Sequence, residues 1–217
     1  PRWYYKEGYI KAILLYLGGI LNHEKVDAFT DRLGVLGFNM QLRDNWGYEI
    51  TLLGGRSKDL DKEFGSYEID VSTWFNPSPK WNGNVWGGYQ KTYNFARNYL
   101  AFYSWFGSSF SMHALDIMDV GTSLNAFIEG NPDNNIEDVT YNARPFVSLT
   151  PLNDLNMRLY VDNVYVRSTG EFEQLIVGFL FSYSFLPKSW IYLAVNEIRD
   201  RSPEYDALGN TLPQRMH

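Results

Sequence analysis

The chain has 217 residues, a formal net charge of -6 and no cysteine. The missing cysteines exclude disulfides, thiolate metal sites and cysteine nucleophiles within this sequence, and the absence of Lys/Arg clusters argues against a nucleic-acid partner. Aromatic residues make up 17% of the chain, although the mean hydropathy is only -0.32. A β-barrel in a lipid bilayer shows both properties, because it needs an apolar outer surface, a polar interior and aromatic rings at the membrane–water interfaces. An aromatic-rich carbohydrate-binding sandwich would show the same bulk numbers.

The longest apolar run lies around Ala12–Leu21, which is half of the ~20 residues that a spanning helix requires. Any membrane crossing would therefore use strands, since only helices and closed barrels satisfy the backbone in lipid. The first residue is Pro1, and the last residues, Gln214–His217, follow a polar stretch. We expect residues 1–217 to be part of one β-barrel domain, with the N-terminal domain or domains and the final strand or strands lying outside this sequence.

Apolar and polar side chains alternate with a period of two along several stretches. Residues 31–43 are the first, and 67–75, 155–167 and 172–185 follow. Successive side chains of a strand point to opposite faces, so each predicted strand has one apolar and one polar face. The longest runs cover the ~9–11 tilted residues that cross a bilayer. The pattern predicts an all-β, antiparallel up-and-down transmembrane β-barrel, incomplete here, with roughly 10–12 strands.

The alternation sorts the strand residues into two groups. The residues predicted to face lipid are Leu36, Phe38, Met40, Val71, Leu159, Val177 and Phe179. The residues predicted to line the interior are Asn39, Gln41, Arg43, Glu68, Asp70, Arg158 and Asp162.

Residues 90–129 follow this pattern least well. Both faces are apolar over 99–106, where five aromatic and two aliphatic residues are distributed over both sets of alternate positions. Two interpretations fit: a strand covered on the inside by a plug or another protein, or a core strand of a soluble protein.

Short turn signals rich in Pro, Gly, Asn and Asp occur at 43–47, 76–80, 150–154 and 186–189. Longer polar connections are expected at 55–66, at 130–138 and from about Asp200 to His217. Short turns at one end and long loops at the other are typical of outer-membrane barrels. Aromatic residues gather near strand ends and fit interfacial belts, although the same rings would also pack turns in a soluble sheet. They are Trp3, Tyr4, Tyr5, Trp46, Tyr48, Trp74, Trp81, Trp190 and Tyr192.

The candidate catalytic pair is Glu68 and Asp70, which lie on one face of one predicted strand. Residues i and i+2 are ~6.6–6.8 Å apart along a strand, within the range of an inverting glycosidase pair. Two solvated carboxylates on a wet face explain them more simply, and no second motif supports catalysis. We therefore expect no enzyme in this segment.

No metal or cofactor site is expected either. Asp116, Asp119 and the acidic stretch 133–138 offer the oxygen ligands that calcium prefers, but the EF-hand spacing is absent. A polar external loop explains them more simply. His23, His113 and His217 are scattered, with no HExxH motif. No GxSxG motif is present to support a nucleophilic triad.

The C-terminal half carries a family resemblance. Residues 142–146, 149–151 and 155–159 form a recurring hairpin style, and 179–197 is the segment with the greatest likeness. Over 140–199, and more loosely over 30–90, the chain resembles the uncharacterised barrel domain that follows a carbohydrate-binding family-nine-like domain in large bacterial proteins. The resemblance implies an outer-membrane barrel of unknown function and transfers no catalytic residues.

Together these features predict a porin-like protein of the bacterial outer membrane, in contact with its lipid and with other envelope proteins, that serves passage, secretion or scaffolding rather than catalysis. Two alternatives stay open. One is a soluble, secreted all-β module that binds or hydrolyses polysaccharide through Trp74, Trp81 and Trp86. The other is a plugged, non-conducting structural subunit of an envelope complex.

Overall fold

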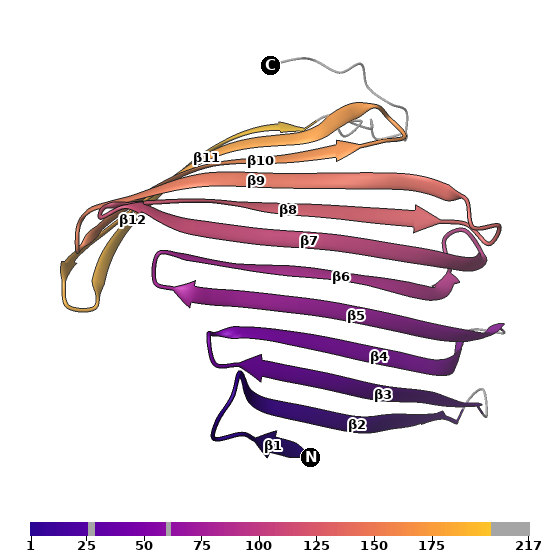
Figure 1. Ribbon diagram of the computed structural model, residues 1–217. Coiled ribbons are helices and arrows are strands. Elements are labelled where there is room, and N and C mark those ends of the chain that lie inside the picture. The colour runs from indigo at the N-terminus through magenta and orange to yellow at the C-terminus, as the bar shows by residue number, and fades with distance from the viewer. Residues whose placement is uncertain (26–28, 60–61, 201–217) are drawn as a thin grey trace, which may run out of the picture.

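A computed structural model describes residues 1–25, 29–59 and 62–200. These residues form a single twelve-stranded antiparallel sheet (Figure 1). The strands are β1 (Arg2–Tyr4), β2 (Ile10–Glu24), β3 (Phe29–Leu42), β4 (Trp46–Asp59), β5 (Lys62–Ser78), β6 (Trp81–Asn94), β7 (Tyr99–Leu115), β8 (Met118–Gly130), β9 (Ile136–Leu152), β10 (Leu155–Val166), β11 (Glu171–Leu186) and β12 (Ser189–Asp200).

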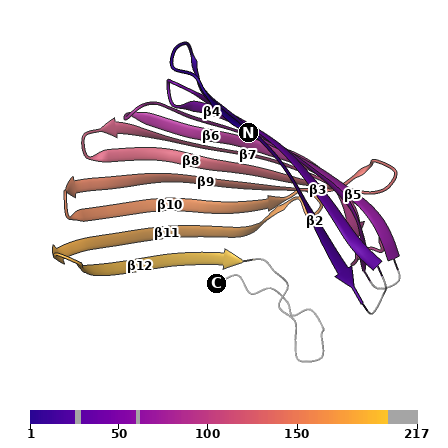
Figure 2. The same cartoon turned by 90° about the horizontal axis from the view of Figure 1, so that it is seen from below.

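Each strand pairs with the next one along the chain, in the order β1 to β12. This confirms the predicted all-β, up-and-down antiparallel meander, and the strand number falls within the expected range. Figure 2 shows that the sheet is strongly curved. It is not closed into a barrel: the outer strands are β1, which pairs only with Ala12–Leu14, and β12.

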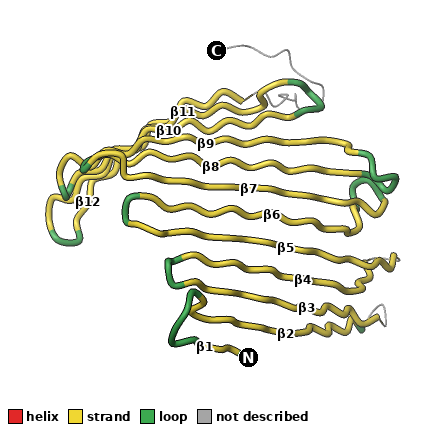
Figure 3. Tube along the Cα trace, viewed as in Figure 1, coloured by secondary structure: helices red, strands yellow, loops and turns green. Residues whose placement is uncertain are grey.

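Tight turns join the strands at one end of the sheet (Figure 3). They occupy 43–45, 79–80, 116–117, 153–154 and 187–188, so the four turn signals in the sequence mark real hairpins. Asn45 and Lys188 adopt the left-handed conformation there, with φ of 58° and 68°. Asparagine tolerates this conformation because its short polar side chain bonds locally, which makes the first turn readable from sequence.

The connections at the opposite end are shorter than predicted. The expected loop over 55–66 is wrong, because β4 continues to Asp59 and β5 begins at Lys62. The charged residues that suggested a loop lie at the ends of β4 and β5, where the two strands extend beyond their apolar segments and their backbones remain paired. The connection predicted over 130–138 narrows to 131–135. The third predicted loop, beyond Asp200, lies outside the described residues, as does His217.

Cross-strand pairing keeps one set of side chains on one face throughout the sheet. Directly paired residues point the same way, and Leu17, Leu36, Leu52 and Ile69 are successive partners across β2–β5. A second series crosses β9–β12 as Val147, Leu159, Phe179 and Val195. We call this side the apolar face and the opposite side the polar face.

The apolar face is not covered by a second layer in the described part of the chain. Leu17 and Leu21 are 83% and 75% exposed, and none of the larger described side chains is fully buried. Of the buried apolar residues in the described part of the chain, only Val139 has the parity of the apolar face, and the others have that of the polar face: Ala12, Ala101, Tyr160 and Val166. A soluble sheet buries such a face against another layer, and the described residues supply no such layer here.

Aromatic rings on the polar face lie flat over glycines of the neighbouring strand. On the polar face of the described strands, six glycines have a ring as their direct cross-strand partner, and a Cβ added at any of them would overlap that ring. The pairs are Tyr16–Gly37, Trp74–Gly47, Trp86–Gly107, Trp105–Gly88, Phe146–Gly121 and Tyr160–Gly178. Placing a ring over a strand glycine fills the space left by the missing side chain.

This arrangement explains the ambiguous stretch over 99–106. Trp105 lies on Gly88, and Tyr103 stacks with Phe127 at 5.7 Å between ring centroids. The polar-face rings of β7 are therefore covered by the sheet itself, and their presence does not require a plug.

Substitution of Gly37 tests the ring-on-glycine contact. We expect Gly37→Ala to lower the free energy of unfolding by about 1–3 kcal/mol, the usual cost of overpacking, because the new methyl group displaces the Tyr16 ring. Gly34→Ala on the same strand is the control, since its Cβ would approach no atom closer than 3.7 Å. Urea unfolding of both variants measures the difference, and equal stabilities would contradict the contact.

Candidate functional site

The seven residues predicted to face lipid all lie on the apolar face, and six of the seven predicted to line an interior lie on the polar face; the seventh, Arg43, lies in the turn after β3. Arg43 behaves differently from the other six. Its guanidinium donates two hydrogen bonds to the connection between β1 and β2. Nε donates to the backbone carbonyl of Gly8 at 2.7 Å, and Nη2 donates to that of Tyr5. Arg43 therefore fastens the β1–β2 turn. The polar face is the candidate site, because it carries the chemistry-bearing side chains.

The first polar cluster joins β2, β3 and β4. The Tyr16 ring crosses Gly37, and its hydroxyl lies 2.8 Å from Thr51 Oγ1 and 3.3 Å from Glu49 Oε1. Asn39 Nδ2 donates to the other oxygen of Glu49 at 2.9 Å. Because Gly37 has no side chain, the tyrosine reaches two strands away and ties them together.

The central strands carry a ladder of amide and hydroxyl contacts. Gln90 Nε2 donates to Glu68 Oε2 at 2.9 Å, and Ser111 Oγ donates to Asn82 Oδ1 at 2.9 Å. Ser109 Oγ donates to Asn84 in the same way. Glu68 and Asp70 do share a face, as predicted, but Glu68 is one member of this cross-strand ladder.

The third cluster centres on Asp162 of β10. Asn142 Nδ2 donates to Asp162 Oδ1 at 2.6 Å, and Arg144 Nε lies 3.7 Å from Oδ2. Tyr160 repeats the device of Tyr16: its ring crosses Gly178, and its hydroxyl donates to Asn196 Oδ1 at 3.1 Å.

Two arginines in this cluster stack on aromatic rings. The Arg144 guanidinium carbon lies 4.5 Å from the centroid of the Tyr160 ring, and that of Arg158 lies 3.9 Å from the Phe146 centroid. Phe146 and Tyr160 are direct cross-strand partners. The two cations are thereby held against the sheet by cation–π attraction.

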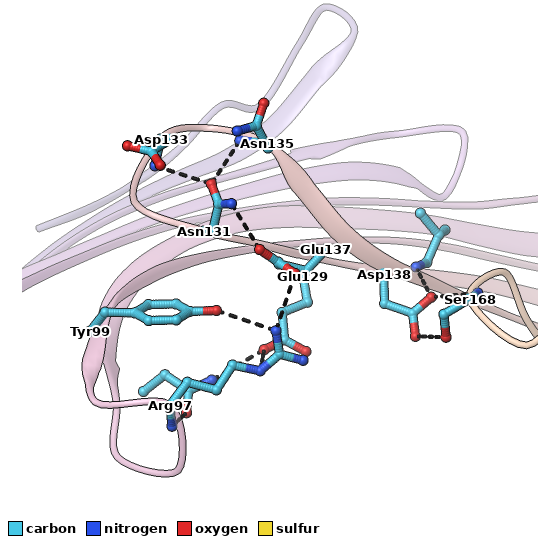
Figure 4. A network of polar contacts seen from close by, with 11 residues as sticks. Arg97, Tyr99, Glu129, Asn131, Asp133, Asn135, Glu137, Asp138 and Ser168 are labelled. Carbon is cyan, nitrogen blue, oxygen red and sulfur yellow. Dashed lines mark hydrogen bonds and ion pairs between the residues drawn. The ribbon is translucent and has the colours of Figure 1, made fainter.

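A polar network ties together the connections at the loop end (Figure 4). Arg97, in the turn after β6, lies 3.4 Å from Glu129 Oε1 and 3.5 Å from Glu137 Oε2. It also donates to the Tyr99 hydroxyl at 3.2 Å. The hydrogen bond to Tyr99 and the carboxylates of Glu129 and Glu137 raise the pKa of the Arg97 guanidinium above its ordinary value.

The neighbouring connections are fixed by side-chain caps. Asn131 Oδ1 accepts from the backbone amides of Asp133 and Asn135, each at 3.0 Å, and its Nδ2 donates to Glu137 at 2.8 Å. Ser168 Oγ donates to Asp138 Oδ2 at 2.7 Å (Figure 4). The acidic stretch 133–138 thus organises its own loop.

The residues considered for calcium are not brought together. Asp119 Oδ1 lies 2.8 Å from His113 Nδ1 at the turn end of the strands, whereas residues 133–138 lie at the loop end. No group of three or more acidic or histidine side chains in the described residues is placed to hold a metal ion.

The three tryptophans considered for polysaccharide binding do not form one platform. Trp74 and Trp86 lie on the polar face over Gly47 and Gly107. Trp81 lies on the apolar face, with its ring centroid 5.6 Å from that of Phe75 and 6.4 Å from that of Phe110. A sugar chain on one face would therefore meet two of the three.

Rings on the apolar face form two rows. One row, at the turn end, contains Trp46, Phe75, Trp81 and Phe110, with successive centroids 5.2, 5.6 and 6.4 Å apart. The other, near the loop end, contains Tyr67, Tyr89 and Phe102, 5.8 and 6.0 Å apart. Sequence reasoning located the first row in part, through Trp46 and Trp81, and missed the second.

Comparison with known proteins gives no relatives. No protein-family model, no curated protein and no solved structure matches the chain. Among the described residues, no helix has the length and apolar character to cross a membrane.

A double-mutant cycle tests the Tyr16 cluster. We expect Tyr16→Phe to lower the free energy of unfolding by about 1 kcal/mol, the usual net worth of a hydrogen bond, and to be non-additive with Thr51→Val. Tyr48→Phe, on the apolar face of β4, is the control and should change little. Additive effects of the Tyr16 and Thr51 substitutions in urea unfolding would show that the contact contributes nothing.

Proposed function

We propose that this chain forms part of the wall of a bacterial outer-membrane β-barrel, with the apolar face against lipid and the polar face towards a water-filled interior that serves the passage of polar solutes. One observation carries the proposal: an apolar face that continues across the sheet and has no covering layer in the described residues. Lipid supplies the apolar surroundings that such a face otherwise obtains from a second layer.

The spacing of the aromatic rows supports this reading. Tyr67 and Phe75 belong to opposite rows of the same strand and are eight residues apart, which corresponds to about 27 Å along a strand. Strands in such barrels tilt by ~35–45°, so the rows would be about 20 Å apart across the membrane, near the ~25 Å apolar band flanked by aromatic girdles. Ile69, Val71 and Thr73 lie between them.

The polar face supports a wet interior rather than a dry core. Its acidic, basic and amide groups are joined across strands, and Glu49, Glu68 and Asp162 each accept a hydrogen bond from a neighbouring amide. Such a face suits contact with water and passing solutes. A catalytic role has no comparable support: Glu68, one of the two candidate acids, is held in a cross-strand ladder by Gln90, and no second motif accompanies the pair.

The proposal places one requirement on the edges of the sheet. An unpaired strand edge cannot face hydrocarbon, because each unsatisfied backbone group there costs several kcal/mol. The sheet edges expose apolar side chains: beyond the three residues of β2 that pair with β1, Leu17 and Ile20 are 83% and 63% exposed, and Tyr192 of β12 is 73% exposed. In the proposed barrel, both edges pair with further strands.

Fractionation and conductance test the proposal against its alternatives. The protein should remain with the membrane pellet after an alkaline carbonate wash and should be released by detergent. Release by the wash alone would favour the soluble polysaccharide module. In a planar bilayer, discrete conductance steps would support passage, whereas a sealed bilayer with the protein inserted would favour the plugged structural subunit.

A charge placed on each face tests the orientation of the sheet. We expect Phe179→Arg to lower the free energy of unfolding in lipid by ~2–4 kcal/mol, the cost of an arginine near the bilayer midplane. Ser182→Arg, on the polar face of the same strand, should cost far less. Similar losses for both variants would contradict the assignment of the apolar face to lipid.

A further inference from the structure

Residues of β7–β10 surround a hollow on the polar face. The cavity has a volume of about 330 Å³, and its polar lining includes Ser109, Ser111, Ser123, Arg144 and Arg158, with Phe146 beside them. Arg144 and Arg158 belong to adjacent strands, and Ser123 is the direct cross-strand partner of Arg144.

The two arginines converge on this hollow from opposite directions. Phe146 and Tyr160 are cross-strand partners, and Arg144 and Arg158 each lie two residues before one of them on antiparallel strands, which places this pair of rings between the two arginines. Arg144 leans over Tyr160, and Arg158 leans over Phe146. The stacking contacts hold both guanidinium groups against rings of the sheet beside the hollow.

The charge in the hollow is not balanced. Asp162 Oδ2 lies 3.7 Å from Arg144 Nε, whereas Arg158 has no carboxylate within ion-pair distance in the described residues and makes its contact with Phe146. The lining of the hollow thus contains two guanidinium groups and no carboxylate, and within the described residues only Arg144 has an acidic neighbour at ion-pair distance.

The serine hydroxyls that line the hollow differ in whether their protons already have an acceptor. Ser109 and Ser111 use their hydroxyl protons on Asn84 and Asn82. Within the described residues, the Ser123 hydroxyl has no such partner, and its proton remains available next to Arg144. Guanidinium forks and a hydroxyl donor are the groups that recognise the oxygens of carboxylates and phosphates.

We propose that Arg144, Arg158 and Ser123 form a binding site for an oxyanion, a carboxylate or phosphate group carried by a polar solute. The proposal rests on the proposed function in one respect: solutes reach this face through a water-filled interior. Six of the eight residues that line the hollow have the parity of the polar face, the exceptions being Phe110 and Thr122, so a soluble anion is the expected occupant rather than a lipid headgroup.

Calorimetric titration with inorganic phosphate tests the site. The full chain is titrated in neutral detergent micelles at fixed ionic strength, and saturable binding is expected. Arg158→Gln and Arg144→Gln should each weaken the affinity about tenfold or more, because each removes a charge-assisted pair of hydrogen bonds. Arg167→Gln, in the exposed turn after β10, removes the same charge elsewhere and should leave the affinity unchanged.

The outcomes separate this inference from the proposed function. Circular dichroism and heat-induced unfolding establish that each variant folds before it is titrated. Absence of saturable phosphate binding, equal binding by Arg158→Gln and Arg167→Gln, or binding of phosphatidylglycerol micelles without binding of inorganic phosphate would each overturn the site. If carbonate releases the protein from membranes, the wall proposal fails, and the same titration is then done on the soluble chain.

Discussion

The structure depends on cross-strand hydrogen bonding that keeps the apolar side chains on one face from β2 to β12, with the register shifts confined to positions near the strand ends. Because each strand pairs with its neighbour in the sequence, the side-chain parity set at Leu36 and Leu52 is passed on to Leu159 and Phe179. A slip of one residue at any hairpin would move apolar side chains onto the polar face. The tight turns at one end prevent such slips, and the two faces of the sheet follow from this constraint.

A sheet without a second layer still has to fill the space above its strands, and here aromatic rings do this from within the sheet. Tyr16 and Tyr160 cross a glycine each and place their hydroxyls on residues two strands away. Trp105 covers Gly88 in the same way. These contacts give the polar face the rigidity that a packed core gives a soluble domain. They also leave that face free for polar groups and solvent.

The sequence predicted the sheet well because period-two alternation depends on local pattern alone. The two faces are legible in Leu36, Phe38 and Met40 against Asn39 and Gln41. The expected loop over 55–66 was wrong because charge was taken as a sign of a loop, although strands that extend beyond an apolar band keep their backbone pairing. Contacts that depend on the register between strands could not be predicted, because the sequence pattern does not show which residues are cross-strand partners.

Register and side-chain direction also decide most of the candidate site. Tyr16 meets Gly37 only because the β2–β3 pairing has one particular offset. Arg43 has the parity of an interior residue, yet its guanidinium turns to the carbonyls of Tyr5 and Gly8. Arg144 went unremarked in the sequence, since its importance comes from Tyr160, Asp162 and Arg158 on the next strand.

Accessibility of single cysteines along β5 is the most direct measurement of which face meets lipid. The chain contains no cysteine, so each variant carries one reactive thiol. In intact membranes, a charged, water-soluble maleimide should label Asp70→Cys and Ser72→Cys on the polar face and leave Ile69→Cys and Val71→Cys unreacted until detergent is added. Equal labelling of all four positions, or labelling of Ile69→Cys and Val71→Cys alone, would contradict a membrane wall with this orientation.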